Sequence, residues 1–175
     1  MRARLVLLPV DGENMVNAAA NDVNSTTVEN VKESGRLLAI DLGARRVGVA
    51  VSDELRMTVR PLMTIERRNW KGLVRRIIEQ IEVLEARGLV VGLPVNIDGT
   101  EGPAALEARQ IAAKFELSLK IPVYLQDERL TSEEAKSRFR DIQHRERAGD
   151  IDSAAAAIIL EDFIDRQQSR RANSD

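Results

Sequence analysis

The hydrophobic pattern predicts two paired strands early in the chain. Residues 37–41 and 46–52 are mostly apolar, and a short turn segment containing Gly43 separates them. A tight turn of this kind joins antiparallel strands, so we expect a hairpin.

Residues 57–66 are a candidate third strand, in which Pro61 requires an edge position or a bulge because proline cannot donate a ladder hydrogen bond.

Farther along, apolar positions spaced for helices alternate with runs that are apolar on both sides. Residues 89–93 and 121–127 are such runs, which are typical of buried strands in a parallel sheet. Helices are expected around them, at about residues 73–87, 103–119, 131–145 and 150–167. This order predicts an α/β fold with a mixed five-stranded sheet. Its first three strands are antiparallel and the others parallel, and helices cover both faces.

The composition restricts the chemistry that the chain can perform. Its 175 residues include no cysteine and a single histidine, His144. These counts exclude disulfides, thiolate metal sites, a cysteine nucleophile and a multi-histidine zinc site. If the chain is an enzyme, its working groups are therefore expected among its 28 acidic residues.

The length suits one domain with its own core. We expect residues 1–35 to be a flexible N-terminal extension, residues 36–168 to be the folded domain and residues 169–175 to be a flexible tail. The apolar run near the N-terminus does not continue as a signal peptide, and no apolar run is long enough to span a bilayer. The expected location is the cytoplasm, with no membrane partner.

Basic residues are unevenly distributed. The net charge is only −2, but residues 45–76 contain nine basic side chains against three acidic ones. A local excess of this kind attracts phosphate groups, which would make nucleic acid the partner. A solvated arginine-rich surface explains the charge alone equally well.

Acidic residues stand where two of the predicted strands end. Asp41 closes the first strand and Glu128 follows the strand at 121–127, and open α/β sheets form their sites at the carboxyl ends of strands. Asp152 precedes a very hydrophobic helix start, which must pack on the sheet and can carry Asp152 to the same edge. Three carboxylates brought together repel one another unless a hard cation joins them, so the set predicts a Mg²⁺ or Mn²⁺ site. Two such ions would promote hydrolysis of a phosphodiester without histidine or cysteine.

Each acid also has a structural explanation. Asp41 is compatible with an ordinary turn residue, Glu128 with an acid that favours the start of a following helix, and Asp152 with the N-cap of its own helix. Capping and metal binding by Asp152 are compatible, because a carboxylate has two oxygens. Spacing alone does not exclude three neighbouring acids from the site: Asp98, Asp127 and Asp150.

Four segments resemble, in order and spacing, a known bacterial family. They are AIDLGARRVGVAVSD, VVGLPVNIDGTEG, VYLQDERLTSEEA and DIDSAAAAIILEDFI, which together cover about residues 36–167. The family is that of the Holliday-junction resolvase-like proteins, whose members are also described as pre-16S ribosomal RNA nucleases. The resemblance implies an RNase H-like fold and a nuclease domain over residues 36–168.

The resemblance also implies roles for particular residues. It assigns the catalytic and metal-binding roles to Asp41, Glu128 and Asp152. The candidate substrate-binding residues are Gly43, Arg45, Asn96 and Arg129. The chain departs from the family pattern in residues 1–35, which have no counterpart, and in Asp150, where a basic or neutral residue is expected.

Three functions are compatible with these observations. The leading hypothesis is a metal-dependent endonuclease that acts on structured RNA, at the 5′ end of the 16S ribosomal RNA precursor during ribosome biogenesis. A resolvase of four-way DNA junctions is the close alternative, and it needs two active sites and hence a dimer. The expected state is therefore a monomer or a weak homodimer. A distant alternative is a nucleotide-binding protein of the actin and sugar-kinase type, which also begins with a D-x-G hairpin but uses two lobes and a second glycine-rich phosphate turn.

Overall fold

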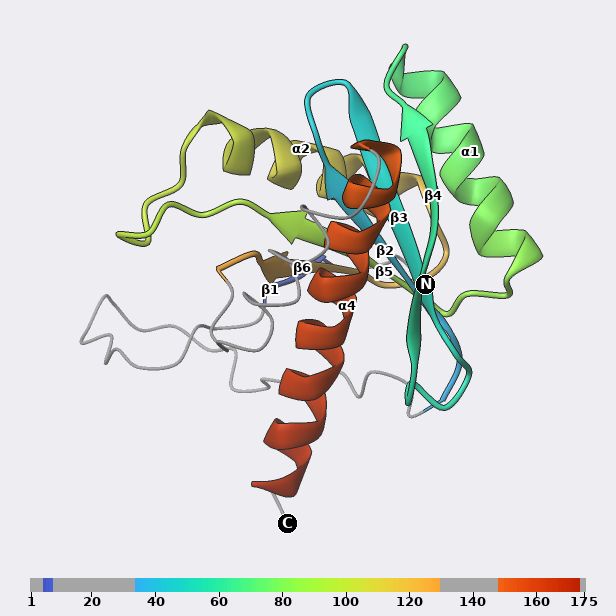
Figure 1. The fold of residues 1–175 in the computed structure, drawn as a ribbon, viewed down its shortest axis with the longest axis vertical. Helices are drawn as coiled ribbons and strands as arrows, with labels where there is room; N and C mark the ends of the chain where they lie inside the picture. The colour runs from blue at the N-terminus through green and yellow to red at the C-terminus, as the bar shows by residue number, and fades with distance from the viewer. Residues whose placement is uncertain (1–4, 8–33, 130–147, 174–175) are drawn as a thin grey trace, which may run out of the picture.

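The computed structural model describes residues 5–7, 34–129 and 148–173, which form a six-stranded sheet and three helices (Figure 1). The strands are β1 (Leu5–Leu7), β2 (Leu37–Leu42), β3 (Arg46–Ser52), β4 (Val59–Glu66), β5 (Gly88–Leu93) and β6 (Val123–Asp127). The helices are α1 (Trp70–Val83), α2 (Pro103–Ser118) and α4 (Ala148–Ala172). The strand order across the sheet is β1-β6-β5-β2-β3-β4.

The predicted antiparallel half of the sheet is confirmed. β2 pairs with β3, and β3 pairs with β4, both antiparallel. The register shifts between Val49 and Ala50, which face Met63 and Pro61, so that Leu62 is the extra residue of a bulge. Pro61 therefore lies both on an edge strand and at a bulge, where its missing N–H costs no ladder hydrogen bond.

The parallel half contains one strand more than predicted. β2, β5 and β6 pair in parallel, as expected for strands joined by helical crossovers. Beyond β6 lies β1, which pairs in parallel with it in the register Leu5 with Val123. The sequence analysis assigned these residues to the flexible extension. A three-residue apolar segment carries almost no periodic signal, and it becomes a strand here because the edge of β6 offers unpaired backbone groups.

The two faces of the sheet bury different helices. Alternate residues of a strand point to opposite faces. Leu38 and Ile40 belong to the core that includes α1 and α2, whereas Leu37 and Ala39 belong to the core that includes α4. Phe163 of α4 is fully buried, and burial of such a side chain contributes about 1.5–3 kcal/mol. The prediction of helices on both faces is confirmed.

Helix α4 is longer than predicted. It begins at Ala148 and ends at Ala172, whereas we expected a helix over about 150–167. The predicted domain end at residue 168 therefore lies inside the helix. Arg170 and Arg171 in the last turn suit the negative end of the helix dipole, which favours the extra turn.

Some predictions fall on other parts of the chain. The helix predicted over residues 131–145 lies outside the described residues, as does most of the predicted N-terminal extension. Within the described residues, no helix has the length and apolar character needed to cross a bilayer.

Candidate active site at the carboxyl edge of the sheet

Asp41 lies at the end of β2, on the face of the sheet that α4 covers. Its side follows from the strand alternation, because Ala39, two residues earlier, packs against α4. Its register partner on β3 is Gly48. On the other side, the parallel register with β5 ends at Ile40 and Val91, and its continuation by one residue places Gly92 next to Asp41. Asp41 is therefore flanked by two residues without side chains, which leaves space around its carboxylate.

Gly48 lets α4 approach β3 at this point. A Cβ atom on Gly48 would lie 1.7 Å from the carbonyl oxygen of Asp152 and 2.8 Å from the backbone nitrogen of Ser153. Such short contacts are sterically excluded, so α4 can lie here only because residue 48 is glycine. The close approach places Asp152 next to the end of β2.

Gly92 makes room for Glu128. A Cβ atom on Gly92 would lie 2.3 Å from Oε1 of Glu128. The backbone N–H of Glu128 donates to the carbonyl oxygen of Leu93 at 3.1 Å, which extends the pairing of β5 and β6 beyond the strand ends. The side chain of Glu128 therefore lies over β5, on the side of Asp41.

These placements couple the charges of the three acids. Burial, and then the charge of Asp152, raise the pKa of Asp41 from 3.8 to about 6. Burial raises the pKa of Glu128 from 4.5 to about 8, and the charges of Asp41 and Asp127 add to the shift. Carboxylates that are so poorly solvated either take up protons near neutral pH or require a cation. The structure thus brings Asp41 into electrostatic contact with both Glu128 and Asp152, while their catalytic role stays a prediction.

Asp152 does not cap α4, contrary to the structural explanation suggested by its sequence. The helix begins at Ala148, so Asp152 is its fifth residue, whereas an N-cap stands before the first. The carboxylate instead forms an ion pair with Arg46 of β3, with 2.7 Å between Oδ2 and Nε. Apart from this contact, Oδ2 is shielded from water and has no hydrogen-bond partner among the described residues.

The chemical type of these donor groups suits a hard divalent cation. The groups are carboxylates, two with raised pKa values and one whose shielded oxygen contacts Arg46. In the parts of the chain that the structure describes, no three acidic or histidine side chains converge closely enough to hold one ion. Arg46 supplies positive charge beside Asp152 where an ion would otherwise do so. A cation shared by the three acids would therefore compete with Arg46 for Asp152.

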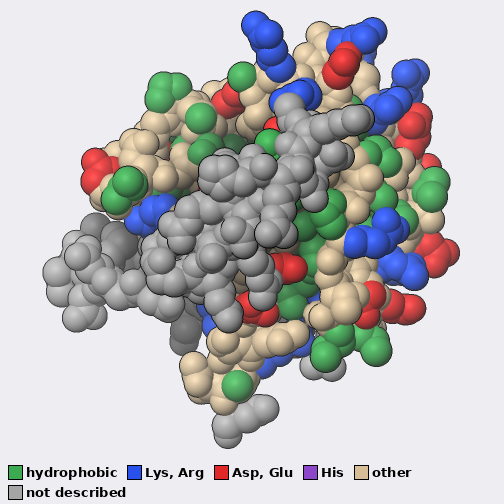
Figure 2. All heavy atoms as spheres, viewed as in Figure 1, with side chains coloured by type: hydrophobic (Ala, Val, Ile, Leu, Met, Phe, Trp, Pro, Cys, Tyr) green, Lys and Arg blue, Asp and Glu red, His purple; other side chains and the backbone are tan. Residues whose placement is uncertain are grey.

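A basic groove opens beside Asp152. Its volume is about 650 Å³, and its basic lining residues are Arg45, Arg46, Arg67 and Arg68. Figure 2 shows Lys and Arg side chains gathered at the top of the view, where Figure 1 places the turn between β2 and β3 and the start of α1. Guanidinium groups bind phosphate oxygens through paired, charge-assisted hydrogen bonds. The groove is thus suited to a phosphate backbone that passes the acidic edge.

The turn between β2 and β3 forms one wall of this groove, and Arg67 holds it in place. Nη1 of Arg67 donates to the carbonyl oxygen of Gly43 at 3.0 Å, and its backbone N–H donates to the carbonyl oxygen of Arg45 at 2.9 Å. Arg67 also forms an ion pair with Glu107 of α2. A Cβ atom on Gly43 would lie 2.7 Å from the carbonyl oxygen of Arg46, so the turn requires glycine. Gly43 therefore shapes the wall, and the exposed Arg45 stands on it.

Asn96 and Arg129 lie in contacts of their own. The side-chain amide of Asn96 donates to Oγ1 of Thr100 at 2.9 Å, within the loop between β5 and α2. Arg129 pairs with Asp127, at 2.9 Å from Nε and 2.6 Å from Nη2 to Oδ2. Nη1 of Arg129 also lies 3.6 Å from a Cβ position on Gly99, which brings it next to that loop. A substrate role for Asn96 and Arg129 stays a prediction.

Two of the competing acids are engaged elsewhere. Asp98 accepts hydrogen bonds from the backbone N–H and the hydroxyl of Thr100, at 2.9 and 2.6 Å. Asp127 is held by Arg129, although its charge contributes to the raised pKa of Glu128. The side chain of Asp150 lies outside the described residues.

The sequence analysis did not single out Arg46 or Arg67. Both belong to the basic run of residues 45–76, which indicated a surface and not a particular contact. The strand alternation was sufficient to find Arg46, because Arg46 and Gly48 share one side of β3 and Gly48 faces α4. Arg67 carried no such signal, since its contact with Gly43 depends on how β4 folds back along β3.

The strand order and the acidic edge agree with the mixed α/β sheet and the strand-end acids expected from the sequence. A family model described as RuvX, Holliday junction resolvase, matches residues 35–166, and the chain belongs to this family. The chain is 46% identical over 134 residues to a protein of Anaeromyxobacter sp. (strain K) and 40% identical over 138 residues to one of Roseiflexus sp. (strain RS-1). These alignments cover 75% and 78% of this chain and 98% of each relative, and both relatives are provisionally named pre-16S rRNA nucleases.

Two solved structures align with most of this chain. Thermus thermophilus RuvC aligns with a TM-score of 0.46 and 17% identity, over 76% of this chain and 96% of RuvC. The fowlpox virus Holliday junction resolvase aligns with a TM-score of 0.49 and 11% identity, over 75% of this chain and 99% of the viral protein.

Proposed function

We propose that this protein is a metal-dependent endonuclease that hydrolyses phosphodiester bonds in structured RNA, with the 5′ end of the 16S ribosomal RNA precursor as its substrate. The observation that carries the proposal is the coupling of Asp41 with Glu128 and Asp152 beside a groove that bears four arginines. Membership of the family and the names of its relatives support the substrate. The protein would then act in the cytoplasm, where the precursor is made.

The arginines of the groove would bind and orient the RNA. Arg45 and Arg68 are exposed in the lining of the groove, where they can hold phosphates without reading the bases, while Arg67 fixes the turn between β2 and β3. Arg46 is about half exposed while it pairs with Asp152. A phosphate of the substrate would therefore compete with Asp152 for Arg46. When Arg46 binds the phosphate instead, Oδ2 of Asp152 would be released.

Asp41, Glu128 and Asp152 would hold the divalent cation, Mg²⁺ or Mn²⁺. Cations bound by such acids lower the pKa of a water and offset the charge of a phosphate, in the manner of two-metal hydrolases. The protein's own contribution is the placement of the acids. The ladder of β2 fixes Asp41, and the burial of Asp41 and Glu128 keeps both carboxylates poorly hydrated and ready to exchange a proton for a cation.

Cleavage of precursor RNA by the purified protein tests this proposal. We expect cutting with Mg²⁺ or Mn²⁺, none with EDTA, and none with the Asp41→Asn variant. Asp165→Asn is the matched control, because Asp165 is an exposed acid farther along α4, and it should cut as the wild type does. The proposal fails if no condition gives cutting or if Asp41→Asn retains the wild-type rate.

A four-way DNA junction is the second candidate substrate, because the family model carries the description of a Holliday junction resolvase. Symmetric resolution requires two active sites, so the protein would have to dimerise on the junction. We propose a monomer or weak homodimer in the absence of nucleic acid. Sedimentation with and without junction DNA tests this alternative, and a monomer on the junction without paired cuts would exclude it.

A further inference from the structure

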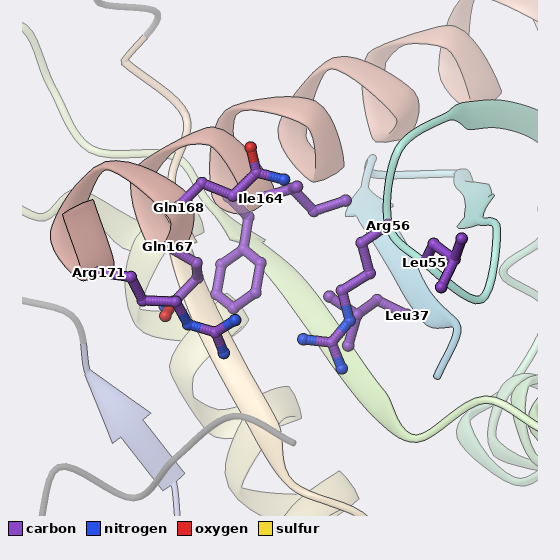
Figure 3. A pocket seen from close by; sticks show the side chains of 8 residues that line it. Leu37, Leu55, Arg56, Ile164, Gln167, Gln168 and Arg171 are labelled. Carbon is purple, nitrogen blue, oxygen red and sulfur yellow. The ribbon is translucent and has the colours of Figure 1, made fainter. Parts of the chain in front are cut away.

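A second pocket lies at the opposite end of β2 from the acids (Figure 3). β2 begins at Leu37, which lines this pocket, and ends beside Asp41, so the length of the strand separates the two sites. Its apolar walls come from β2, from the turn between β3 and β4, and from α4. The polar lining residues are Arg56, Gln167, Gln168 and Arg171. This pocket is thus distinct from the basic groove.

The turn between β3 and β4 aims Arg56 into the pocket. The turn is fixed by Asp53, whose carboxylate accepts hydrogen bonds from the backbone N–H groups of Met57 and Thr58 at 2.7 and 2.8 Å. Arg56 has a φ of 57°, in the left-handed region that residues with a Cβ avoid. Arg56 is only 8% exposed, and its Nε donates to the carbonyl oxygen of Gly35 at 2.9 Å. An unfavourable backbone conformation thus holds a cation in a buried position, which suggests that the cation has a use there.

Hydrogen-bond donors and positive charge dominate the pocket. Figure 3 shows the guanidinium groups of Arg56 and Arg171 pointing into the same space from different elements. Burial, and then the nearby charge of Arg171, lower the pKa of Arg56. Nε2 of Gln167 is buried and has no hydrogen-bond partner among the described residues. No acidic side chain lines the pocket within the described part of the chain, so no carboxylate among these lining residues offsets the charge of Arg56.

We propose that this pocket binds a phosphate group, with Arg56, Arg171 and the side-chain amide of Gln167 as its donors. Its volume is about 40 Å³. A single water needs roughly 10–15 Å³, so the pocket admits some of the oxygens of a phosphate and leaves the rest at its opening. The apolar walls formed by Leu37 and Phe163 strengthen the attraction, because they lower the local dielectric. The phosphate is either a free ion or the terminal group of a nucleic acid, which share this chemistry.

Thermal melting of the full chain in sodium phosphate tests the proposal, with sodium chloride of equal ionic strength as the reference. A ligand that binds only the folded state raises Tm as its concentration increases. We expect this rise in phosphate and not in chloride. Arg171→Gln should weaken the phosphate affinity about tenfold, since it removes a charged hydrogen-bond donor. Arg170→Gln is the matched control, because Arg170 does not line the pocket, and it should respond as the wild type does.

A second variant separates the loss of phosphate binding from a loss of the fold. Arg56→Gly removes the guanidinium and introduces a residue that adopts a φ of 57° readily, so the turn should persist. We expect Arg56→Gly to melt cooperatively and to lose the response to phosphate. The proposal is overturned if phosphate raises the wild-type Tm no more than chloride does, which is also the result expected if an acid of the chain itself fills the pocket. It is equally overturned if both variants keep the wild-type response.

RNA binding in EDTA distinguishes the two sources of the phosphate. If the terminal phosphate of RNA is the ligand, Arg171→Gln should weaken binding of a 5′-phosphorylated oligonucleotide and leave a 5′-hydroxyl oligonucleotide unaffected. If free phosphate is the ligand, both oligonucleotides should bind the variant and the wild type alike, while inorganic phosphate still raises the Tm of the wild type. Neither readout requires nuclease activity, so this inference and the proposed function can fail separately.

Discussion

At the scale of single residues, two glycines do as much to define the acidic edge as the acids themselves. Gly48 accepts the backbone of Asp152, and Gly92 accepts the carboxylate of Glu128. In the sequence, each of these glycines is one small residue within an apolar strand, and nothing there indicates which group fills the space beside it. The positions of Asp41 and Glu128 at strand ends were predictable from the sequence. The reason that they approach each other lies in the two glycines, about which the hydrophobic pattern says nothing.

Glu128→Gln should stabilise the metal-free protein at high pH. Its folded pKa of about 8 exceeds the ordinary value of 4.5, so the folded state binds this proton more tightly. The stabilising effect of protonated Glu128 is complete below the lower value and is lost as pH rises through the higher one. In EDTA at about pH 9, the variant should gain at least about 1 kcal/mol, or roughly 2–4 °C in Tm.

The gain should disappear at about pH 5, where Glu128 is protonated. Glu79→Gln is the matched control, because Glu79 is exposed on α1 and its pairing with Arg75 contributes little. Its melting temperature should follow that of the wild type at both pH values. A variant Glu128→Gln that is no more stable than the wild type at high pH would contradict the buried position assigned to this side chain.

Arg46→Gln should change the affinities for metal and for RNA in opposite directions. Without Arg46, the metal ion no longer has to displace a guanidinium group from Asp152. Mn²⁺ affinity measured by calorimetry should therefore rise roughly two- to fivefold. RNA affinity measured in EDTA should fall, because a phosphate contact is lost. Arg68→Gln serves as the control, since Arg68 pairs with Glu66, and it should weaken RNA binding only. Unchanged Mn²⁺ affinity in Arg46→Gln would refute a competition for Asp152.

At the scale of elements, α4 determines whether the site exists. The sequence predicts a helix with a strongly apolar start but places its beginning two to four residues late, which made Asp152 look like a cap. Capping residues and ion-pairing residues are the same amino acids, so local sequence does not separate them. The helix start depends on packing against β3, which is a tertiary contact. The strands were predicted well, because alternation and apolar runs record burial directly.

Gly48→Ala should dislodge the start of α4. The added methyl group would lie 1.7 Å from the carbonyl oxygen of Asp152, and neither backbone can move without loss of packing. We expect a loss of about 3 kcal/mol in the free energy of unfolding, measured by urea denaturation, together with loss of RNA cleavage. Gly72→Ala is the control, because the atoms nearest to its Cβ would belong to the side chain of Asn69, the N-cap of α1, at 3.1 Å or more. It should change stability by less than about 1 kcal/mol and leave cleavage intact.

At the scale of the whole molecule, one sheet separates two cores and connects two sites. The core with α1 and α2 supports β2 from one side, and the core with α4 closes the other. The acids and the groove lie at the carboxyl edge, and the second pocket lies at the start of β2. The mixed sheet was predictable from the order of elements, whereas β1 was not, because a three-residue strand is defined by its neighbour and not by its own pattern.

A chain that begins at residue 34 should still fold and cut RNA. The family match begins at residue 35, and β1 contributes only three register pairs at one edge of the sheet. We expect a cooperative thermal transition and a decrease in Tm of no more than roughly 4 °C, which corresponds to about 1 kcal/mol for a domain of this size. Failure of the shortened chain to melt cooperatively would show that β1 is required for the fold.

The placement of Asp152 on α4, which follows the other two acids in the chain, affects when the protein becomes competent during its own synthesis. A ribosome releases the chain from its N-terminus onward, so the hairpin that bears Asp41 and the crossover that leads to Glu128 emerge before α4 does. A nascent or prematurely terminated chain therefore has two of the three acids and an uncovered sheet. An enzyme proposed to cut ribosomal RNA would in this way lack its third acid until α4 has been synthesised.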